Sequence, residues 1–528
     1  MYKVFVADKL APEGIAALGE YPQIEVDFTP GLSVEDAIVH ARDADAIIVR
    51  SATKLRGALL DACENLKVVG RAGIGVDNID VAVATERGIV VLNTPDANAT
   101  TTAELAIAHI FSLSRQLPLA DRSVRSGEWT PAKFLGAELS GKTVGIIGFG
   151  TIGRLVAERC LGLKMKVIGF DPFVTEATFS EHQVEVQELD ALLQAADYVT
   201  LHCPVTDGTR GLISTEKMAL MKPGARLINC ARGGLIDEAG LLEAVTSGHL
   251  AGAALDVFEQ EPPTNSPLFE QPNIYFTPHL GASTHEAQTA VGVAIAHQIA
   301  AYLTRQEITN AINVASIAPD KLRRLEPYLQ LVRKLGRLLC MMCDGAITEL
   351  STELYGRAAE LDAQAISNEA LVGLLTDHLS VPVNQVNAAH LARRQGINVT
   401  QVSSRESRDY LSVVRLSGKT ADSTICLEGT LFDERQPRLI RVNDFSIESE
   451  LDGQIVMTRH ADQPGVIGAI GELLGREGIN ITRMQVGIAS KDNSQAIGAF
   501  GVSSELSEST MQALRSIEAI DKAMQIRF

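Results

Sequence analysis

The first hundred residues alternate short apolar runs with stretches in which apolar residues recur at helical spacing. The apolar runs cover residues 4–7, 24–27, 46–49, 67–70 and 89–92, and the helical patterns cover residues 12–19, 34–42, 55–63 and 79–87. This alternation predicts a parallel sheet with helices on both faces. Because the carboxyl ends of such strands form a ligand crevice, the loops after residues 49 and 70 are candidates for a binding site.

A long helix is predicted from Thr100 to about residue 117, and the pattern from Thr100 to Glu104 resembles a capping box at its start. His109 lies on the apolar face of this helix, which favours a core histidine. From residue 144 to about 276 strands and helices alternate again, and a helix over about 284–304 then returns to the first lobe. Two lobes joined by two crossings can close over a ligand by a hinge.

The remaining sequence has a different character. After Asn313 an arginine-rich helical segment runs to about residue 340, and alternating stretches follow at 412–416, 423–427 and 439–442. These patterns predict a separate α+β domain. The last part of the chain follows the order β-α-β-β-α-β, which is a ferredoxin-like arrangement.

The expected fold is therefore α/β, with two doubly wound parallel-sheet lobes, an α+β intervening domain and a ferredoxin-like terminal domain. The first lobe, expected to be flavodoxin-like, takes residues 1–97 and 284–312. The second, expected to be a Rossmann lobe, takes residues 98–283. The intervening domain takes residues 313–451 and the terminal domain residues 452–528.

A glycine motif organises the second lobe. Gly148, Gly150 and Gly153 follow an apolar run and open a helical one, and Asp171 closes the next apolar run. In a dinucleotide-binding turn the first glycine allows the tight turn, the second lets a pyrophosphate approach, and the third lets helix and strand pack closely. The acidic residue accepts hydrogen bonds from the ribose hydroxyls of NAD. A purely structural glycine-rich turn is the alternative, and the flanking strand, helix and acid favour NAD.

Composition and charge exclude several classes of partner. The formal net charge of −18 argues against nucleic acid and anionic membranes, because such partners need a positive surface. The chain starts without the zones of a signal peptide, and no apolar run reaches membrane-spanning length. Seven scattered cysteines fit a reducing cytoplasm. Cys340 and Cys343 have the spacing of a redox or metal pair, but the apolar residues around them favour a core-facing helix, and no second pair completes a metal site.

Candidate chemistry gathers in three later loops of the second lobe. Arg232 follows a predicted strand, Glu261 precedes two prolines, and His279 ends another predicted strand. An alcohol loses a hydride only if its proton also leaves, and a histidine suits that proton. A carboxylate can orient the imidazole, and an arginine can hold a substrate carboxylate with two donors. Each residue alone is compatible with a structural role, but together behind the glycine motif they indicate a dehydrogenase that needs no metal.

These stretches closely resemble the D-2-hydroxyacid dehydrogenase family, in which Arg, Glu and His follow the glycine motif in the same order. The likeness covers residues 1 to about 310. It implies catalytic roles for Arg232, Glu261 and His279. It also implies a set of NAD contacts, which together with the glycine motif comprises Gly148, Gly150, Thr151, Ile152, Gly153, Asp171, Cys203, Cys230, Ala231, Arg232, Asp256, His279, Leu280, Gly281 and Ala282.

The loops at residues 50–54 and 70–78, with Trp129 and Lys133, look like the branch of that family that oxidises 3-phosphoglycerate to 3-phosphohydroxypyruvate, the first step of L-serine synthesis. The resemblance implies that Lys133 reaches in from a neighbouring subunit. Another D-2-hydroxyacid dehydrogenase or hydroxypyruvate reductase, and a non-enzymatic NADH-sensing scaffold, are the alternatives. The implied substrate contacts are Arg50, Ser51, Arg71, Gly73, Ile74, Arg232, His279 and Lys133.

The terminal domain resembles an ACT regulatory domain in the expected turn from His460 to Gly465 and in the segment from Gly478 to residue 481. This likeness implies an L-serine effector at His460, Asp462 and Asn480, bound across the interface of a homodimer or homotetramer. The alternative is a domain that only assembles subunits. The intervening domain resembles the family's allosteric substrate-binding domain in its placement alone.

Overall fold

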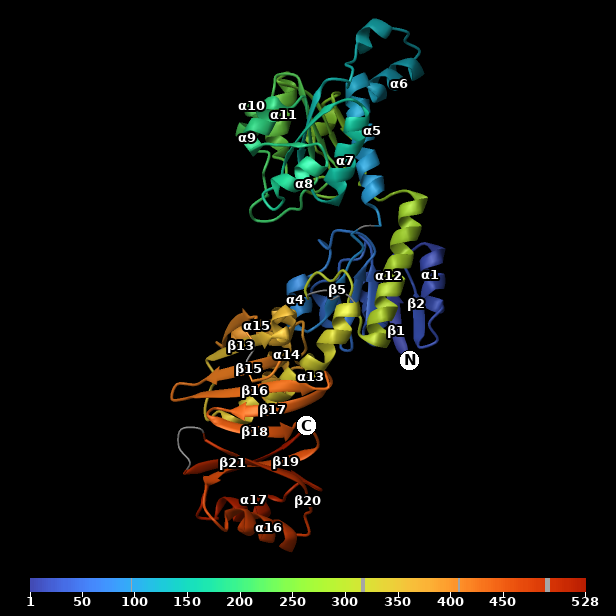
Figure 1. Cartoon of the computed structure of the whole chain (residues 1–528). Coiled ribbons are helices and arrows are strands. Elements are labelled where there is room, and N and C mark those ends of the chain that lie inside the picture. The colour runs from blue at the N-terminus through green and yellow to red at the C-terminus, as the bar shows by residue number, and fades with distance from the viewer. Residues whose placement is uncertain (96, 315–318, 407–408, 490–493) are drawn as a thin grey trace.

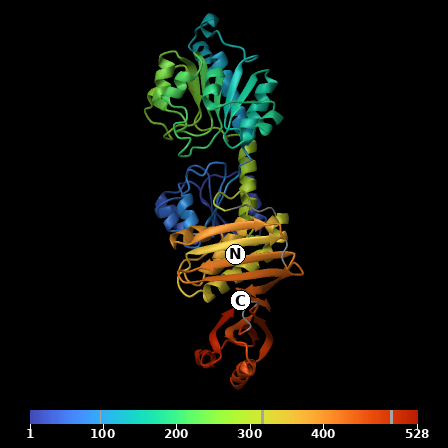
Figure 2. The same cartoon turned by 60° about the vertical axis from the view of Figure 1, so that its left-hand side comes forward.

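The computed structural model describes residues 1–95, 97–314, 319–406, 409–489 and 494–528. Four sheets lie in a row, with the second lobe at one end, the first lobe beside it, and the intervening and terminal domains beyond (Figures 1 and 2). None of the described helices is both long and apolar enough to cross a bilayer.

The sheet of the first lobe has five parallel strands in the order β2-β1-β3-β4-β5, which is the flavodoxin-like order. Its central strands are buried on both faces, as expected where helices cover both sides. The elements are β1 (Tyr2–Val6), α1 (Pro12–Gly19), β2 (Ile24–Phe28), α2 (Val34–Ala41), β3 (Ala46–Val49), α3 (Ala58–Asp61), β4 (Val68–Arg71), α4 (Val81–Glu86) and β5 (Val90–Leu92).

Helix α12 (His285–Arg305) completes the first lobe from a distant part of the chain. The hydroxyl of Thr284 caps it by accepting a hydrogen bond from the Ala287 amide. It packs so closely on α1 that a Cβ atom on Gly14 would come within 2.8 Å of the Gly292 backbone. This packing ties the loop that precedes α12 to the first lobe.

The sheet of the second lobe has seven parallel strands in the order β12-β11-β10-β9-β6-β7-β8, which is the dinucleotide-binding order. Separate apolar cores fill its two faces. The order turns between β6 and β9, where ligands bind in sheets of this kind. The elements are α5 (Ala99–Arg115), β6 (Thr143–Ile147), α7 (Thr151–Gly162), β7 (Lys166–Phe170), α8 (Glu176–Glu181), β8 (Glu185–Val186), α9 (Leu189–Ala195), β9 (Tyr198–Leu201), α10 (Thr215–Leu220), β10 (Ala225–Asn229), α11 (Glu238–Thr246), β11 (Leu250–Leu255), η2 (Pro267–Glu270) and β12 (Ile274–Phe276).

The beginning of the second lobe differs from the sequence prediction. Helix α5 starts at Ala99, and no side chain caps it. The predicted capping box is wrong, because Glu104 points outward and pairs with Arg159 at 3.5 Å. The chain also forms two unpredicted helices, α6 (Leu117–Arg125) and η1 (Pro131–Phe134). Helix α6 buries none of its residues, although its apolar and polar residues are segregated on opposite faces.

The intervening domain has a six-stranded sheet in the order β14-β13-β15-β16-β17-β18, in which only β13 and β14 run parallel. Helices α13 and α14 pack together and contact the sheet. Cys340 and Cys343 lie against this core, and burial raises the pKa of each thiol to about 11. The elements are α13 (Pro319–Met342), β13 (Glu349–Gly356), η3 (Arg357–Glu360), α14 (Ala363–Leu375), α15 (Ala388–Arg394), β14 (Asn398–Ser404), β15 (Ser412–Lys419), β16 (Thr424–Phe432), β17 (Gln436–Val442) and β18 (Phe445–Glu450).

The terminal domain has an antiparallel sheet in the order β20-β21-β19-β22, the ferredoxin-like order. Its two helices cover one face with their own core. The other face joins the core of the intervening domain through Ile455, Met457, Ile497, Ala499 and Ile526. The predicted fold class is confirmed over all four units. The elements are β19 (Gln454–Ala461), α16 (Val466–Arg476), β20 (Ile481–Ile488), β21 (Gln495–Val502), α17 (Glu508–Arg515) and β22 (Ile520–Arg527).

His460 does not lie in the turn where the sequence analysis placed it. It belongs to strand β19 and pairs with Ala496 and Ile520 on the two neighbouring strands. Its side chain is buried, and its Nδ1 atom lies 3.0 Å from the Thr458 hydroxyl. Burial lowers the pKa of the His460 imidazole. The strand is longer than its apolar run, because the hydrogen-bond ladder continues past the last apolar side chain.

Candidate active site

A cavity of about 220 Å³ lies where loops of both lobes meet. The loop after β4 contributes the first-lobe wall, and the loops after β9, β10 and β12 contribute much of the second-lobe wall. Ten predicted site residues line it together, namely Arg71, Ile74, Ile152, Cys203, Cys230, Ala231, Arg232, His279, Gly281 and Ala282. Five lining residues were not predicted, namely Gly75, Asn98, Thr102, His202 and Pro204.

The glycine motif has the geometry of a dinucleotide-binding turn. Gly148 has a φ of +93°, and a Cβ atom there would come within 2.8 Å of the His202 carbonyl and the Cys203 amide. A Cβ atom on Gly153 would lie 2.1 Å from the Gly148 oxygen, so only glycine allows α7 to pack this closely on the strand. A Cβ atom on Gly150 would meet nothing within 4 Å. The open space at Gly150 and the free amides at the start of α7 fit a pyrophosphate.

Asp171 lies beside this turn at the end of β7. Its Oδ2 atom accepts a hydrogen bond from the Phe149 amide at 2.8 Å, and its Oδ1 atom accepts one from the Phe173 amide at 2.9 Å. Each oxygen keeps a second lone pair. The carboxylate is therefore fixed in place and retains the capacity to accept ribose hydroxyls.

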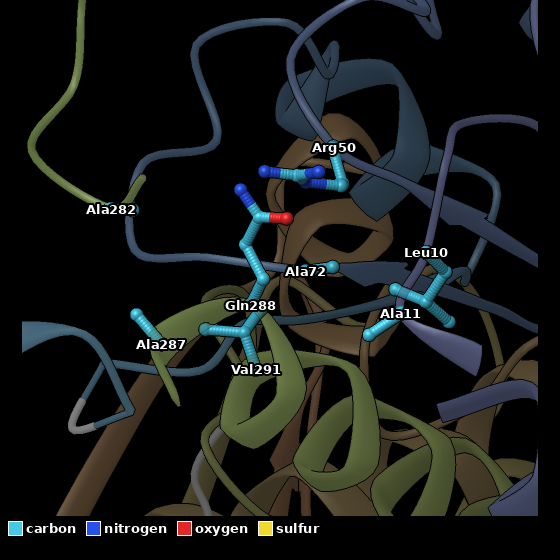
Figure 3. A pocket seen from close by; sticks show the side chains of 8 residues that line it. All are labelled: Leu10, Ala11, Arg50, Ala72, Ala282, Ala287, Gln288 and Val291. Atoms are coloured by element: carbon cyan, nitrogen blue, oxygen red, sulfur yellow. The ribbon is translucent and has the colours of Figure 1, made fainter. Parts of the chain in front are cut away.

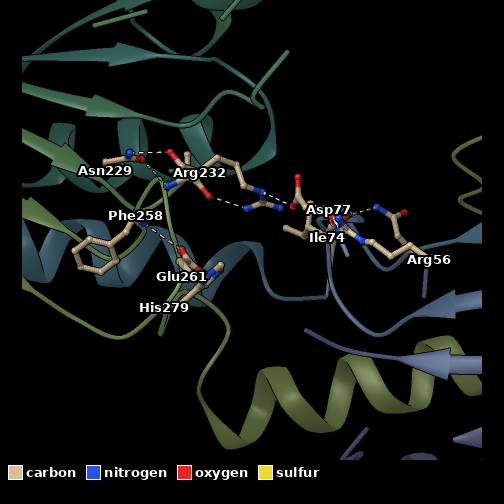
Figure 4. A network of polar contacts seen from close by, with 10 residues as sticks. Arg56, Ile74, Asp77, Asn229, Arg232, Phe258, Glu261 and His279 are labelled. Carbon is tan, nitrogen blue, oxygen red and sulfur yellow. Dashed lines mark hydrogen bonds and ion pairs between the residues drawn. The ribbon is translucent and has the colours of Figure 1, made fainter. Parts of the chain in front are cut away.

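His279 and Glu261 form a hydrogen-bonded pair on the second-lobe side of the cleft (Figure 4). The imidazole Nδ1 lies 2.7 Å from Glu261 Oε2, while Glu261 Oε1 accepts a hydrogen bond from the Phe258 amide at 3.1 Å. Burial raises the pKa of the Glu261 carboxyl, but the hydrogen bond and charge of His279 outweigh it, and the net pKa is lowered. With Nδ1 facing this carboxylate, Nε2 is the ring nitrogen left for a reacting atom.

A buried network that the sequence analysis did not find holds the loop of His279. Asp256 is completely buried and accepts hydrogen bonds from the amides of Leu280 and Gly281 at 2.7 and 2.9 Å. The Thr277 hydroxyl donates to the same carboxylate at 2.6 Å and lies 3.2 Å from His109 Nε2. The predicted core position of His109 is confirmed, and its ring also supports the loop. Asp256 therefore lies behind the wall of the cavity and holds the loop of His279 in place.

Arg232 extends from the second lobe toward the first (Figure 4). Its backbone carbonyl accepts a hydrogen bond from the Asn229 side chain at 2.8 Å, which fixes the loop. Its Nη1 atom donates to the Ala231 carbonyl at 2.6 Å, and its Nε atom donates to Asp77 Oδ2 of the first lobe at 3.1 Å. Asp77 was not among the predicted residues.

Arg71 is the most enclosed cation at the cleft. Its Nε atom is buried without a hydrogen-bond partner, and its Nη1 atom donates to the Ala72 carbonyl at 3.2 Å. Burial and then the nearby charges of Arg232 and Arg50 lower its pKa to about 10. Gly73 has a φ of +142°, which favours glycine, and a Cβ atom there would lie 1.4 Å from Arg71 Nη1. A buried guanidinium among like charges is a site that an anion would stabilise.

Arg50 points toward Gln288 of helix α12, as Figure 3 shows. The two side chains line a crevice with a volume of about 10 Å³. That volume holds about one water molecule and no phosphate group. An anion that reaches Arg50 must therefore come from the larger cleft or follow a movement of the lobes. Gln288 was missed because a glutamine on a helix has no distinctive spacing in the sequence.

Besides Arg50, three more predicted substrate contacts lie outside the lining of the cavity. Ser51 is an exposed residue of the loop after β3, and Gly73 supports Arg71 rather than facing the cavity. Lys133 pairs with Glu128 at 3.4 Å in η1, in the excursion that contains α6. Figure 1 shows this excursion at the end of the second lobe away from the cleft. Lys133 therefore does not reach the site of its own chain.

His202 is a partly buried residue on the wall of the cavity. Its Nε2 atom lies 2.9 Å from the Thr200 hydroxyl, and its Nδ1 atom has no hydrogen-bond partner. Burial lowers its pKa to about 3, so the ring stays neutral at physiological pH. In the part of the chain that the structure describes, no three His, Cys, Asp or Glu side chains are grouped to share a metal ion.

Three family models match separate parts of the chain. Residues 107–281 match "D-isomer specific 2-hydroxyacid dehydrogenase, NAD binding domain", residues 324–443 match "D-3-phosphoglycerate dehydrogenase intervening domain", and residues 454–519 match "ACT domain".

Similar proteins match over nearly the whole chain. A D-3-phosphoglycerate dehydrogenase of Bacillus subtilis is 38% identical over 98% of both chains. One of Methanocaldococcus jannaschii is 39% identical over 92% of both. Among solved structures, D-lactate dehydrogenase from Aquifex aeolicus in complex with NAD and lactic acid has a TM-score of 0.51 and 28% identity, and covers 57% of this chain and 95% of its own.

The glycine turn allows a test that separates ligand binding from folding. Gly150→Ala places a methyl group in the space for the pyrophosphate, so the Kd for NAD should rise by about tenfold or more with little change in Tm. Gly153→Ala instead forces helix and strand apart, so it should lower the free energy of unfolding by about 1 to 3 kcal/mol. Fluorescence titration and scanning calorimetry measure the two effects. Equal loss of stability in both variants would contradict the assignment of Gly150.

Proposed function

Because the chain belongs to the D-3-phosphoglycerate dehydrogenase family, we propose that it oxidises 3-phospho-D-glycerate to 3-phosphohydroxypyruvate with NAD, with Arg232, Glu261 and His279 as its catalytic residues. The observation that carries the residue assignment is the 2.7 Å pair of His279 and Glu261, because His279 lines the same cavity as Arg232 and Ile152, which follows Gly150 in the dinucleotide turn. Proton transfer, carboxylate binding and cofactor binding are then all available at one place.

Bound NAD supplies the acceptor for the hydride that leaves C2 of the substrate. His279 takes the proton of the C2 hydroxyl on Nε2, because its Nδ1 faces Glu261. The lowered pKa of Glu261 keeps this carboxyl ionised, so it stabilises the imidazolium that forms. Arg232 binds the substrate carboxylate and polarises the oxygen on C2. In the opposite direction the same imidazolium returns the proton.

The cationic groups of the first lobe favour a phosphorylated substrate over other 2-hydroxy acids. Arg71 is buried among like charges, and Arg50 contributes to lowering its pKa. The Arg50 guanidinium donates to the Lys9 carbonyl at 3.2 Å, and the Arg50 amide donates to Asp8 Oδ2 at 2.6 Å. A phosphate dianion would neutralise this concentration of positive charge, whereas an unphosphorylated acid would leave part of it uncompensated. We therefore assign the phosphate to Arg50 and Arg71.

The four units divide the work. Residues 1–97 with 284–312 bind the substrate, residues 98–283 bind NAD, residues 313–451 connect to the regulatory end, and residues 452–528 form the ACT domain. All seven cysteines are free thiols, which fits a cytoplasmic enzyme. Lys133, distant from its own cleft, is assigned to the site of a neighbouring subunit.

The ACT domain is the proposed receptor for L-serine. Asp462 directly follows β19 and Asn480 directly precedes β20, and both are exposed, so a second copy of the domain would complete a site between them. Met484, Val486 and Ile488 leave an exposed apolar row on β20, the edge strand of the sheet. An exposed apolar edge strand favours pairing with another copy. His460 is buried within its strand and supports this region without facing solvent.

Replacing the base tests the catalytic assignment. His279→Gln should lower kcat by about 10²- to 10⁴-fold, because the C2 proton loses its acceptor, while the Kd for NAD stays nearly unchanged. His285→Gln, on the exposed first residue of α12, is the matched control and should keep normal activity. Steady-state kinetics with fluorescence titration of the nucleotide measure both. A loss of less than tenfold in kcat would remove the base role from His279.

Removing Arg50 tests the phosphate assignment. Arg50→Ala should raise the KM for 3-phosphoglycerate by about 10- to 100-fold, since a charge-assisted hydrogen bond to phosphate is lost. Turnover of unphosphorylated D-glycerate should change little. Lys54→Ala, an exposed cation in the same loop, serves as the control for net charge. Equal effects on the two substrates would contradict a phosphate contact.

Calorimetric titration of the full chain with L-serine tests the ACT site. Binding heat should appear for the wild type, fall strongly in Asn480→Ala, and persist in Gln512→Ala on the exposed surface of α17. Light scattering of the same sample should give two or four times the chain mass of 56.6 kDa. Absence of binding heat in the wild type would leave the domain with an assembly role alone.

A further inference from the structure

Asp77 already binds one of the edges through which the guanidinium of Arg232 can hold a carboxylate. Nη1 donates to the Ala231 carbonyl of its own loop at 2.6 Å. The parallel N–H groups on Nε and Nη2 form a fork that can bind a carboxylate through both of its oxygens. Asp77 Oδ2 lies 3.1 Å from Nε (Figure 4). A substrate carboxylate that binds this fork therefore needs the same donors as Asp77.

The loop that carries Asp77 lies directly beside the guanidinium of Arg232. A Cβ atom on Gly75 would lie 1.8 Å from Arg232 Nη2 and 2.7 Å from Asp77 Oδ2, so the backbone of the loop borders the fork. The side chain of Arg56 also bonds to the backbone carbonyl of Asp77 and holds the loop from behind. Among the residues described, the contact of Asp77 with Arg232 is the single ion pair that joins the two lobes.

A substrate carboxylate can readily replace Asp77 at Arg232. The Asp77 side chain is 73% exposed and that of Arg232 is 27% exposed, so solvent screens their attraction. An exposed pair of this kind is weak, and salt weakens it further. A substrate that presents both oxygens of a carboxylate to Nε and Nη2 makes a stronger, two-pronged contact. Asp77 can then withdraw into solvent without leaving a buried charge.

We propose that Asp77 is a positioning residue that stands in for the substrate carboxylate, holding the fork of Arg232 across the open cleft and competing with substrate and product for it. This inference rests on the proposed function, since it requires Arg232 to bind the C1 carboxylate. It adds a residue that sets the affinity for the acid while touching neither the reacting atoms nor the cofactor. The same charge also repels an anionic substrate as it approaches Arg71 and Arg232.

The test compares Asp77→Asn and Asp77→Glu with the wild type in the full-length enzyme. Asp77→Asn removes the competing charge at constant size, so the KM for 3-phosphoglycerate should fall by about two- to tenfold at low salt, with kcat unchanged or lower. The KM for NAD should stay the same. The fall should shrink as sodium chloride is raised, because screening already weakens the pair in the wild type. Asp77→Glu keeps the competitor and should keep a KM close to that of the wild type.

Asp61→Asn, an exposed acid of the same lobe, controls for the change in net charge and should not move the KM. A KM that stays equal or rises in Asp77→Asn would overturn the proposal, because the acid would then only hold the loop. A wild-type chain that binds NAD but does not oxidise 3-phosphoglycerate would instead contradict the proposed function. The two failures are therefore distinguishable in one set of measurements.

Discussion

The buried carboxylate of Asp256 is the interaction on which the catalytic geometry depends. It accepts hydrogen bonds from the amides of Leu280 and Gly281 and from the hydroxyl of Thr277. These bonds fix the chain on both sides of His279. A charge in the interior is tolerated only when hydrogen bonds satisfy it, and here the groups that satisfy it belong to the active-site loop. The loop cannot move away without exposing an unsatisfied charge. Rigid support for His279 thus follows from the cost of burying Asp256.

Positive charge gathers at the cleft between the two lobes. The chain is acidic overall, yet three guanidinium groups, those of Arg50, Arg71 and Arg232, influence one another at the cleft. Their mutual repulsion is tolerated because backbone carbonyls and the carboxylates of Asp77 and Asp8 partly compensate it. Local charge, and not net charge, therefore determines which small molecule the cleft attracts.

Sequence patterns predicted the sheets and the order of the catalytic residues because both leave local signals. Buried strands show as apolar runs, and the glycine motif combines spacing with a flanking acid. The supporting contacts leave no such signal. His109 and Thr277 meet across 168 residues, and Asp77 and Arg232 across 155, so only the folded chain brings them together. His460 was misplaced for a related reason, since the pairing of β19 with its neighbours extends the strand beyond its apolar run.

The apolar face that the terminal domain shares with the intervening domain has a mechanical consequence. Ile455, Met457 and Ile526 belong to the same core as α13 and α14, so this junction is a packed interior and not a flexible joint. The two domains should therefore unfold in one cooperative transition and move as one rigid body. A displacement of the terminal domain is then transmitted through this packed core to the contact with the first lobe. At that contact the Asn384 side chain donates a hydrogen bond to the Gly88 carbonyl at 2.8 Å.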